Sequence, residues 1–520
     1  MNWEATANEA ISRNLEQFLL ALSVSLSVAT LSRTVPLFRK IPYTLLLVIV
    51  GIGLAFVDVR LVNLSPELIL EIFLPPLLFE AAWNVSWRSL KTNWFPIVLF
   101  AVVGVIISVV GIAFSLNQFA GLALPIALLV GAALATTDPV AVIALFKELG
   151  ASKKLTILME GESLFNDGAA IVTFVLLVDV FLGIESFSVS DTIASSLAFV
   201  GIGAGLGSII GFGISFLTQR FDLLFVEQSL TLVSAYGTYL ITEKLGGSGV
   251  IGVVTVGIIL GNFGSRIGMS ARTRSIVTEF WEFVAFFVNS ILFLLIGDQT
   301  QFISLGSHLY LIVIAIAATL AMRFIGIYGL STLSNVLTSS EISWREQTVL
   351  WWGGLRGSVS IALALSLPEF IPARQEIIDI VFGVVLFTLL VQGLTIQWVL
   401  KAFNLIGDQT IREEYSELLA RQIALHRILK YLEQPDGFPD LNHELYQSKR
   451  EVVLEELNKA KDRLQELIQT SPELQSIVAE RFEETLLDIE VDTYAELMRV
   501  GRLNINLTPV LTKETVKSED

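Results

Sequence analysis

The sequence predicts an all-α, polytopic membrane protein of about 13 transmembrane helices, followed by a small helical domain on the cytoplasmic side. Of its 520 residues, 53% are hydrophobic and only 16% are charged, and the mean hydropathy is +0.69. Apolar runs of roughly 20 residues, the length that a helix needs to cross a bilayer, recur through the first 402 residues. A transmembrane β-barrel would show short segments of alternating polarity instead.

The predicted spans are separated by short polar connections, and the ninth span is short and rich in glycine. We place them at residues 16–32, 43–57, 67–83, 95–115, 122–146, 163–184, 193–218, 229–244, 250–263, 280–297, 309–330, 346–366 and 377–402.

Basic residues in the loops predict the orientation. If the N-terminus lies outside and the C-terminus in the cytoplasm, 14 Lys and Arg fall on the cytoplasmic side and 4 on the other. Cytoplasmic loops of membrane proteins carry such an excess. We therefore expect a multi-pass protein of the plasma (inner) membrane, embedded in the lipid bilayer, with N-terminus outside and C-terminus cytoplasmic.

The charge composition divides the chain into two domains. Residues 403–520 hold 14 Lys and Arg against 24 Asp and Glu, a net charge of −10, whereas residues 1–402 carry −6. Helical patterns in this tail cover 409–433, 440–469 and 473–499 and are separated by proline-containing turns. We expect a transmembrane domain over 1–402 and an acidic helical tail over 403–520. The tail is interpreted as a solvated helical hairpin, or as a regulatory or dimer-contacting element.

Composition excludes several classes of site. The chain has no cysteine, so disulfides, thiolate metal sites and cysteine nucleophiles are absent. All three histidines, His308, His426 and His443, fall outside the predicted spans, which excludes a histidine proton relay within the membrane. The net charge of −16 argues against nucleic acid as a partner. No cofactor is expected.

Two of the spans are interrupted. Span 5 breaks at Thr137-Asp138-Pro139, and span 12 breaks within Gly353–Gly357. Interrupted helices at corresponding positions of two halves are the best sequence indication of a transporter site. Spans 4–6 and 11–13, over 95–184 and 309–402, would then form two inverted repeats, whose broken helices cross in the membrane. Glycine-rich stretches also occur in ordinary helix packing.

Charged residues at membrane depth mark these breaks. Each half-helix has a partial charge of roughly 0.5 at its end. Asp138 can neutralise the positive ends and Arg356 the negative ends. Buried arginines usually have carboxylate partners, so we expect Arg323 to pair with Glu162, and Arg356 to be the counterpart of Asp138. Alternatively, each arginine binds carbonyl oxygens that the breaks release.

Span 6 carries a polar cluster. Ser163 and Asp167 share one helical face, and Glu162 and Asn166 lie on the adjacent one. Together with the carbonyl of Thr137, these oxygens suit a hard monovalent cation. With Glu162 paired, Asp167 is left without a permanent partner. Burial disfavours its charged form, so a proton and a cation can compete for it.

Span 3 contains a Pro75-Pro76 pair and two acidic residues, Glu71 and Glu80. Proline releases backbone carbonyls that neighbouring helices must satisfy, so most of this pattern is interpreted as packing. Glu80, near the cytoplasmic end, is also a candidate for an entry funnel.

Several motifs, in the same order along the chain, carry a family resemblance. The segments LPPLLFEAAW, TTDPVAVIALFKELG, EGESLFNDGAAIV, VNSILFLLIG and WWGGLRGSVSIALAL closely resemble those of the monovalent cation:proton antiporter-1 family, the sodium/proton exchangers, in its prokaryotic form. The resemblance covers nearly all of residues 15–402 and leaves the tail out.

The resemblance implies a homodimer of thirteen-helix subunits that exchanges Na⁺ or another monovalent cation for protons by elevator-like alternating access. It implies that Asp167 is the shared cation and proton carboxylate, and that Thr137, Asp138 and Ser163 line the Na⁺ site. Glu162 and Arg323 would form a structural ion pair, and Arg356 would stabilise the crossing. The Asn166-Asp167 pair is similar to that of electroneutral members.

Other functions are compatible with parts of the pattern. An intramembrane aspartyl protease could use Asp138 and Asp167 as its acid–base pair, but the sequence lacks the Gly-x-Gly-Asp motif typical of such enzymes. A cation channel or ion sensor could use the same scaffold. The sequence does not decide between Na⁺, K⁺ and Li⁺.

Overall fold

The computed structural model describes residues 3–35, 38, 41–57, 59, 61–62, 64–183, 189–218, 223–265, 269–338, 341–371, 373–406, 409–432 and 443–471, with short stretches between 474 and 502. In these ranges the chain is helical, and the only β-bridge is an isolated pair between Ala151 and Ile406. The chain forms two compact units, Met1–Glu148 with Lys153–Leu405, and Leu149–Ser152 with Ile406–Asp520.

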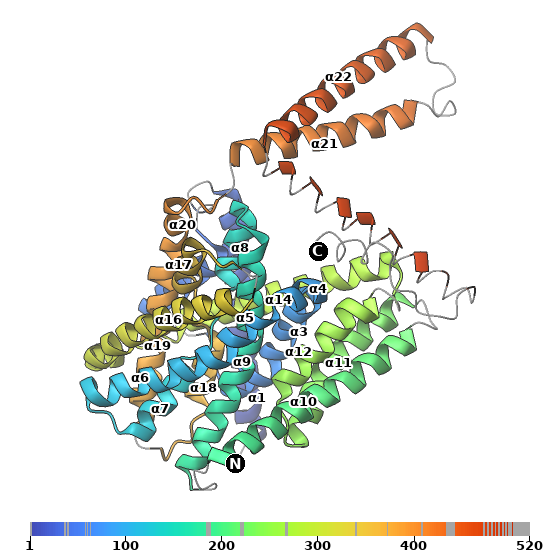
Figure 1. Ribbon diagram of the computed structural model, residues 1–520. Coiled ribbons are helices and arrows are strands. Elements are labelled where there is room, and N and C mark those ends of the chain that lie inside the picture. Colours follow the sequence, from blue (N-terminus) through green and yellow to red (C-terminus); the bar gives the residue numbers. More distant parts are fainter. Residues whose placement is uncertain are drawn as a thin grey trace. The chain divides into compact units, whose positions relative to one another are not determined.

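The described part of the first 402 residues consists mostly of α-helices, and π-helical turns extend some of them (Figure 1). They are α1 (Trp3–Thr34), α2 (Tyr43–Phe56), η2 (Leu68–Phe73), α3 (Leu74–Asn84), α4 (Trp87–Thr92), α5 (Trp94–Val98), η3 (Leu99–Val103), α6 (Gly104–Ala120), α7 (Leu124–Ala133), α8 (Val140–Leu149), α9 (Lys153–Phe181), α10 (Val189–Thr218), α11 (Leu224–Lys244), α12 (Gly249–Ile259), η4 (Leu260–Gly264), α14 (Ala271–Asp298), α15 (Phe302–Ser307), α16 (Leu309–Leu337), α17 (Trp344–Trp352), α18 (Ser358–Leu365), α19 (Arg374–Phe387), η5 (Thr388–Gln392) and α20 (Gly393–Ala402).

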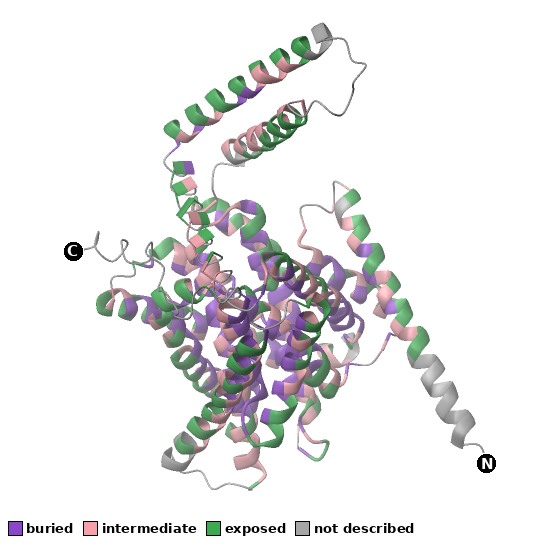
Figure 2. Cartoon of the chain, turned by 90° about the vertical axis from the view of Figure 1, so that its right-hand side faces the viewer, coloured by how far each residue is buried: buried purple, intermediate pink, exposed green. Residues whose placement is uncertain are grey.

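Seven helices among the described residues are long and apolar enough to cross a membrane. Shorter apolar helices lie at Tyr43–Phe56, Leu124–Ala133 and Gly249–Gly264. Large apolar side chains such as those of Leu197, Ile209 and Phe225 are exposed. Exposed residues lie on the outer faces of the helices, and buried residues lie where the helices pack together (Figure 2). An apolar outer surface is what contact with lipid requires. The chain is therefore a multi-pass membrane protein, as predicted.

Helix α9 runs through the middle of the first unit. On one side it contacts α3, α10 and α12, and on the other it contacts α6, α7, α17 and α18 (Figure 1). Close helix pairs elsewhere depend on glycine. A Cβ on Gly51 of α2 would overlap the backbone of Leu294 and Asp298 on α14, and the two helices pack against each other here. Small residues permit such close backbone approach in membranes.

Two of the predicted spans are interrupted where expected. Span 5 consists of α7 and α8, with the nonhelical residues 134–139 between them, and span 12 consists of α17 and α18, with 353–357 between them. Glycine and proline account for these ends, because Pro139 cannot supply an N–H to a continuing helix. The breaks place free backbone groups inside the unit.

Some predicted boundaries are wrong. Span 6 does not begin at residue 163, because α9 already begins at Lys153. The charges of Lys153, Glu160 and Glu162 hid the first turns from a hydropathy pattern. As a result, Glu162 and Ser163 lie well inside the helix.

In span 3, a π-helical turn, Leu68–Phe73, precedes Pro75 and Pro76, which occupy the first turn of α3.

The second unit contains α21 (Gln409–Leu432) and α22 (His443–Thr470), which pack against each other. Leu457, Ala460 and Leu467 of α22 are buried. Arg463 of α22 binds Glu414 of α21 at 2.8 Å. These two helices match the predicted patterns at 409–433 and 440–469. The third predicted helix, 473–499, lies for the most part outside the described residues.

Candidate functional site

The two interrupted spans meet through their backbones. The N–H of Asp138 donates to the carbonyl oxygen of Leu355 at 2.8 Å, and Thr136 Oγ1 lies 2.6 Å from Ser360 Oγ. Asp138 Oδ1 accepts the N–H of Val140 at 3.2 Å, at the start of α8. A Cβ on Gly357, directly before α18, would overlap Asp138 Oδ2. The carboxylate of Asp138 therefore lies at the N-terminal ends of α8 and α18, where negative charge is favourable.

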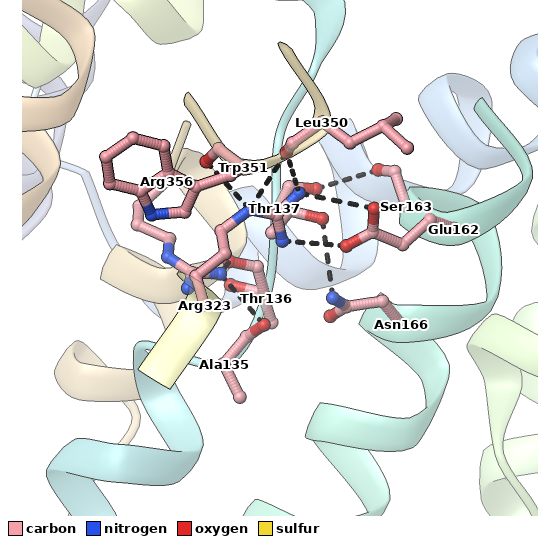
Figure 3. Close-up of polar contacts among 10 residues, drawn as sticks. All are labelled: Ala135, Thr136, Thr137, Glu162, Ser163, Asn166, Arg323, Leu350, Trp351 and Arg356. Carbon is pink, nitrogen blue, oxygen red and sulfur yellow. Dashed lines mark hydrogen bonds and ion pairs between the residues drawn. The ribbon is translucent and has the colours of Figure 1, made fainter. Parts of the chain in front are cut away.

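Arg356 lies on the opposite kind of helix end. Its Nη1 donates to the carbonyl oxygens of Ala135, at 3.0 Å, and Thr136, at 2.6 Å, just beyond the C-terminal end of α7 (Figure 3). The side chain is only 1% exposed. Within the described part of the chain, no ion pair joins Arg356 to Asp138. The expectation that they are counterparts is wrong, and the alternative is confirmed: the guanidinium binds carbonyls that the break releases.

Arg323 of α16 and Glu162 of α9 form a buried ion pair. Nη1 lies 2.7 Å from Oε1 and Nη2 lies 3.2 Å from Oε2, a bidentate geometry (Figure 3). Arg323 Nη2 also donates to the carbonyl oxygen of Leu350 at 2.9 Å, near the end of α17. Both side chains are at most 8% exposed. This arginine therefore makes both contacts that the sequence allowed, one to a carboxylate and one to a released carbonyl.

Thr137 is held by two side chains of α9. Ser163 Oγ donates to its carbonyl oxygen at 2.7 Å, and Asn166 Nδ2 donates to its Oγ1 at 3.4 Å. Asn166 and Thr137 are buried, whereas Ser163 and Asp138 are partly exposed. The four predicted residues Thr137, Asp138, Ser163 and Asn166 are thus brought together at the first break.

Asp167 differs from the other carboxylates of the cluster. It is 8% exposed, and its Oδ1 has no hydrogen-bond partner among the described residues. Its electrostatic neighbours are Asp138, of like charge, and Arg356, of opposite charge. The buried Oδ1 of the adjacent Asn166 also has no partner there. Buried polar atoms are nearly always hydrogen-bonded, so the unpartnered carboxylate oxygen of Asp167 indicates a site for a ligand.

A cavity of about 330 Å³ reaches this carboxylate. Thr137, Asp138, Ser163 and Asp167 line it, together with Glu80, Lys147 and Glu160. Glu80 accepts a hydrogen bond from Asn84 at 2.6 Å, and Lys147 lies 3.6 Å from Glu160. The cavity therefore connects the candidate funnel residue Glu80 with the cluster around Asp167.

Sequence reasoning missed two sets of polar residues. Thr388 of η5 binds the backbone within the second break, and Gln392 binds the backbone of the last residue before it. Asp379 of α19 is buried and accepts hydrogen bonds from Ser304, Gln375 and His308. All lie in or beside span 13, whose strongly apolar sequence gave no charge cluster or break as a signal.

The fold and the site together define a class of protein. A multi-pass helical chain with two crossing interrupted helices, buried charges at the crossing and an unpartnered carboxylate in a cavity is a secondary ion transporter. Residues 22–402 match the model of the transmembrane sodium/hydrogen exchanger family. The chain belongs to this family, whose members are exchangers and not enzymes.

Known proteins agree with this assignment. The chain is 64% identical over 514 residues, 98% of each chain, to a low-affinity Na⁺/H⁺ antiporter, NhaS1, of Synechocystis sp.. It is 63% identical over 516 residues, 99% of each chain, to the Na⁺/H⁺ antiporter ApNhaP of Aphanothece halophytica. Its fold is similar to the solved structure of the sodium proton antiporter MjNhaP1 of Methanocaldococcus jannaschii, with a TM-score of 0.58 at 20% identity, covering 74% of this chain and 99% of the other.

Proposed function

We propose that this chain is a Na⁺/H⁺ antiporter in which one Na⁺ and one H⁺ compete for Asp167. The observation that supports the proposal most directly is that this buried carboxylate has an oxygen without a hydrogen-bond partner among the described residues. Glu162 is neutralised by Arg323, and Asp138 lies at two helix N-termini, whereas Asp167 Oδ1 has no protein partner among the described residues. A buried carboxylate can be neutralised by a proton or by a cation, and both reach it through the cavity.

The surrounding oxygens support a monovalent cation. Asp167, Asp138, Ser163 and Thr137 offer carboxylate, hydroxyl and carbonyl oxygens along one cavity wall. Hard cations prefer such ligands. The described residues contain no group of three or more His, Cys, Asp or Glu able to hold a metal ion. A dense acidic cage of the kind that binds divalent ions is therefore not found there.

The exchange is proposed to be electroneutral. Asn166 contributes a neutral amide beside Asp167, so one carboxylate carries either one proton or one monovalent cation through the cycle. No net charge then crosses the membrane, and the membrane potential neither drives nor opposes transport. This distinguishes the proposal from a cation channel, which would conduct along the potential.

The proposed membrane topology has thirteen spans, of which spans 4–6 and 11–13 form two inverted repeats. The interrupted helices α7–α8 and α17–α18 occupy the middle position of each repeat. In both, the third helix supplies side chains to the break, Ser163 and Asn166 from α9, and Thr388 and Gln392 from η5. This equivalent arrangement supports the repeat assignment.

The distribution of loop charges supports an outside N-terminus, a cytoplasmic C-terminus and the plasma membrane. In this orientation, the ends of the cavity near Lys147 and Glu160 face the cytoplasm, and Glu80 would attract cations there. A homodimer with elevator-like alternating access remains part of the proposal. The residues from 403 onward are proposed to form a cytoplasmic domain that has a regulatory role or contacts the second subunit.

The test is transport by the purified chain in proteoliposomes. A Na⁺ gradient should drive protons across the membrane in the opposite direction to Na⁺. Clamping the membrane potential with valinomycin and K⁺ should leave the rate of this proton transport unchanged. A rate that follows the clamped potential would contradict electroneutrality. Replacing Na⁺ by K⁺ or Li⁺ in the same assay decides the cation, since K⁺/H⁺ exchange at the same site is the second candidate.

A further inference from the structure

The π-helical turn η5 makes two hydrogen bonds to the backbone at the second break, one just before it and one within it. The backbone N–H of Arg356 donates to Thr388 Oγ1 at 3.0 Å, and Gln392 Nε2 donates to the carbonyl oxygen of Trp352 at 2.9 Å. Thr388 and Gln392 are each 1% exposed. They thus fix the backbone at the end of α17 and at Arg356, which lies two positions before the start of α18.

Hydrogen bonds continue from Thr388 to the ion site. Arg356, held through its N–H, binds the carbonyls of Ala135 and Thr136 with its side chain. The next residue, Thr137, presents its carbonyl to Ser163 and its hydroxyl to Asn166. Every member of this series except Ser163 is buried. A displacement of Arg356 would therefore move the released carbonyls beside Thr137.

The location of these residues in a π turn is informative. π turns are rare and frequently lie at functional sites. Residues 388–392 interrupt an otherwise α-helical span of 29 residues, and Thr388 and Gln392 are the first and last residues of the turn. Thr388 also donates to the carbonyl oxygen of Val385 at 2.9 Å, so its hydroxyl is fixed in direction.

We propose that Thr388 and Gln392 are positioning residues for the cation site, and that they act through the backbone of residues 352–356 and the guanidinium of Arg356. The inference rests on the proposed exchange at Asp167. Neither residue lines the cavity that contains Asp167. They would therefore change the affinity for Na⁺ only indirectly, by changing the positions of the residues that line the cavity.

The experiment measures the Na⁺ dependence of exchange in proteoliposomes for Thr388→Val, which keeps the shape and removes the hydroxyl. Leaving the N–H of Arg356 unsatisfied is expected to raise the apparent KM for Na⁺ about three- to tenfold, with a smaller change in maximal rate per folded protein. Thr388→Ser should restore the wild-type KM. Gln392→Met, which keeps the length and removes the amide, should raise the KM in the same direction.

Thr319→Val of α16 is the matched control. Thr319 is 3% exposed, and its Oγ1 has no hydrogen-bond partner among the described residues, so this variant should keep the wild-type KM. If Thr388→Val and Gln392→Met both show the wild-type KM, or lower only the yield of folded protein, the positioning role is wrong while exchange at Asp167 stands. If the wild-type chain itself exchanges no cation, the proposed function fails instead.

Discussion

The N–H of Asp138 donates to the carbonyl oxygen of Leu355, and through this 2.8 Å bond the two interrupted helices are joined by their backbones. Asp138 has its carboxylate at two helix N-termini, and Arg356, the residue after Leu355, has its side chain at a helix C-terminus. Each of these charges thus lies at helix ends of the opposite partial charge. Asp167 lies at no such helix end, and the first prediction concerns it.

Asp167→Asn is expected to abolish exchange and leave the protein folded. The variant cannot be charged, so it has no proton to exchange for a cation. Because it also removes a buried charge, its thermal stability should equal or exceed that of the wild type. Proton flux in proteoliposomes and a melting curve measure the two effects. Asp179→Asn, farther along the same helix, serves as control and should transport normally, and residual exchange in Asp167→Asn would refute the assignment.

The competition model also predicts the pH dependence. As the pH falls, protons occupy a larger share of Asp167, so the apparent KM for Na⁺ should rise by up to about tenfold per pH unit, the limit for one proton displaced by one cation. The maximal rate at saturating Na⁺ should change much less. Initial rates over a matrix of pH and Na⁺ concentration test this, and a KM independent of pH would argue for separate proton and cation sites.

Breaking the ion pair of Glu162 and Arg323 should destabilise the protein. Arg323→Met leaves the carboxylate of Glu162 buried without its bidentate partner and the carbonyl of Leu350 without a donor. We expect a loss of about 3–5 kcal/mol of unfolding free energy. Denaturant unfolding of the detergent-solubilised protein measures it. The variant Arg323→Lys should lose less, because the charge is kept, and equal losses for both would show that geometry alone matters.

Gly357→Ala should disturb the crossing by steric overlap. A Cβ there would overlap the carboxylate of Asp138, which cannot move without leaving its helix ends. Overpacking of this kind typically costs about 1–3 kcal/mol, and exchange should fall with it. The same substitution at Gly326 of α16, where a Cβ would meet nothing within 4 Å, provides the comparison. Normal transport by Gly357→Ala would mean that the residues at the crossing can shift to accommodate the added Cβ.

Glu80→Gln tests the funnel. Removing a negative charge from the cavity lowers the local cation concentration, so the apparent KM for Na⁺ should rise about two- to tenfold at low ionic strength, and less at high ionic strength. Glu71→Gln, a neighbouring acidic residue outside the cavity lining, is the control. An effect that does not depend on ionic strength would indicate a direct ligand instead of an attracting charge.

Much of the site could be predicted because charge at membrane depth is costly and therefore visible in a sequence. Glu162, Arg323, Asp138 and Asp167 stand out for this reason, and both breaks contain glycine or proline. For Arg356, the sequence offered a carboxylate or released carbonyls as the partner and did not decide between them. Carbonyls have no side-chain identity, so a sequence cannot show that Ala135 and Thr136 offer them.

Thr388 and Gln392 were missed for a related physical reason. Uncharged polar residues occur throughout membrane helices, and they usually bind a carbonyl one turn earlier in their own helix. A π turn changes which of these residues face a neighbouring helix, and the residue pattern of 388–392 does not predict a π turn. The early start of α9 was hidden similarly, because the charges in its first turns have the pattern of a loop.

Under the proposed function, Asp167 Oδ1, which has no hydrogen-bond partner among the described residues, makes the stability of this chain sensitive to sodium. A ligand that binds only the folded state raises its stability, by about 2.7 kcal/mol when its concentration is one hundred times its dissociation constant. A cation bound at Asp167 would do so, and protons would compete with it. The melting temperature should therefore report the salt and acidity around the membrane, and can identify the transported cation without any transport assay.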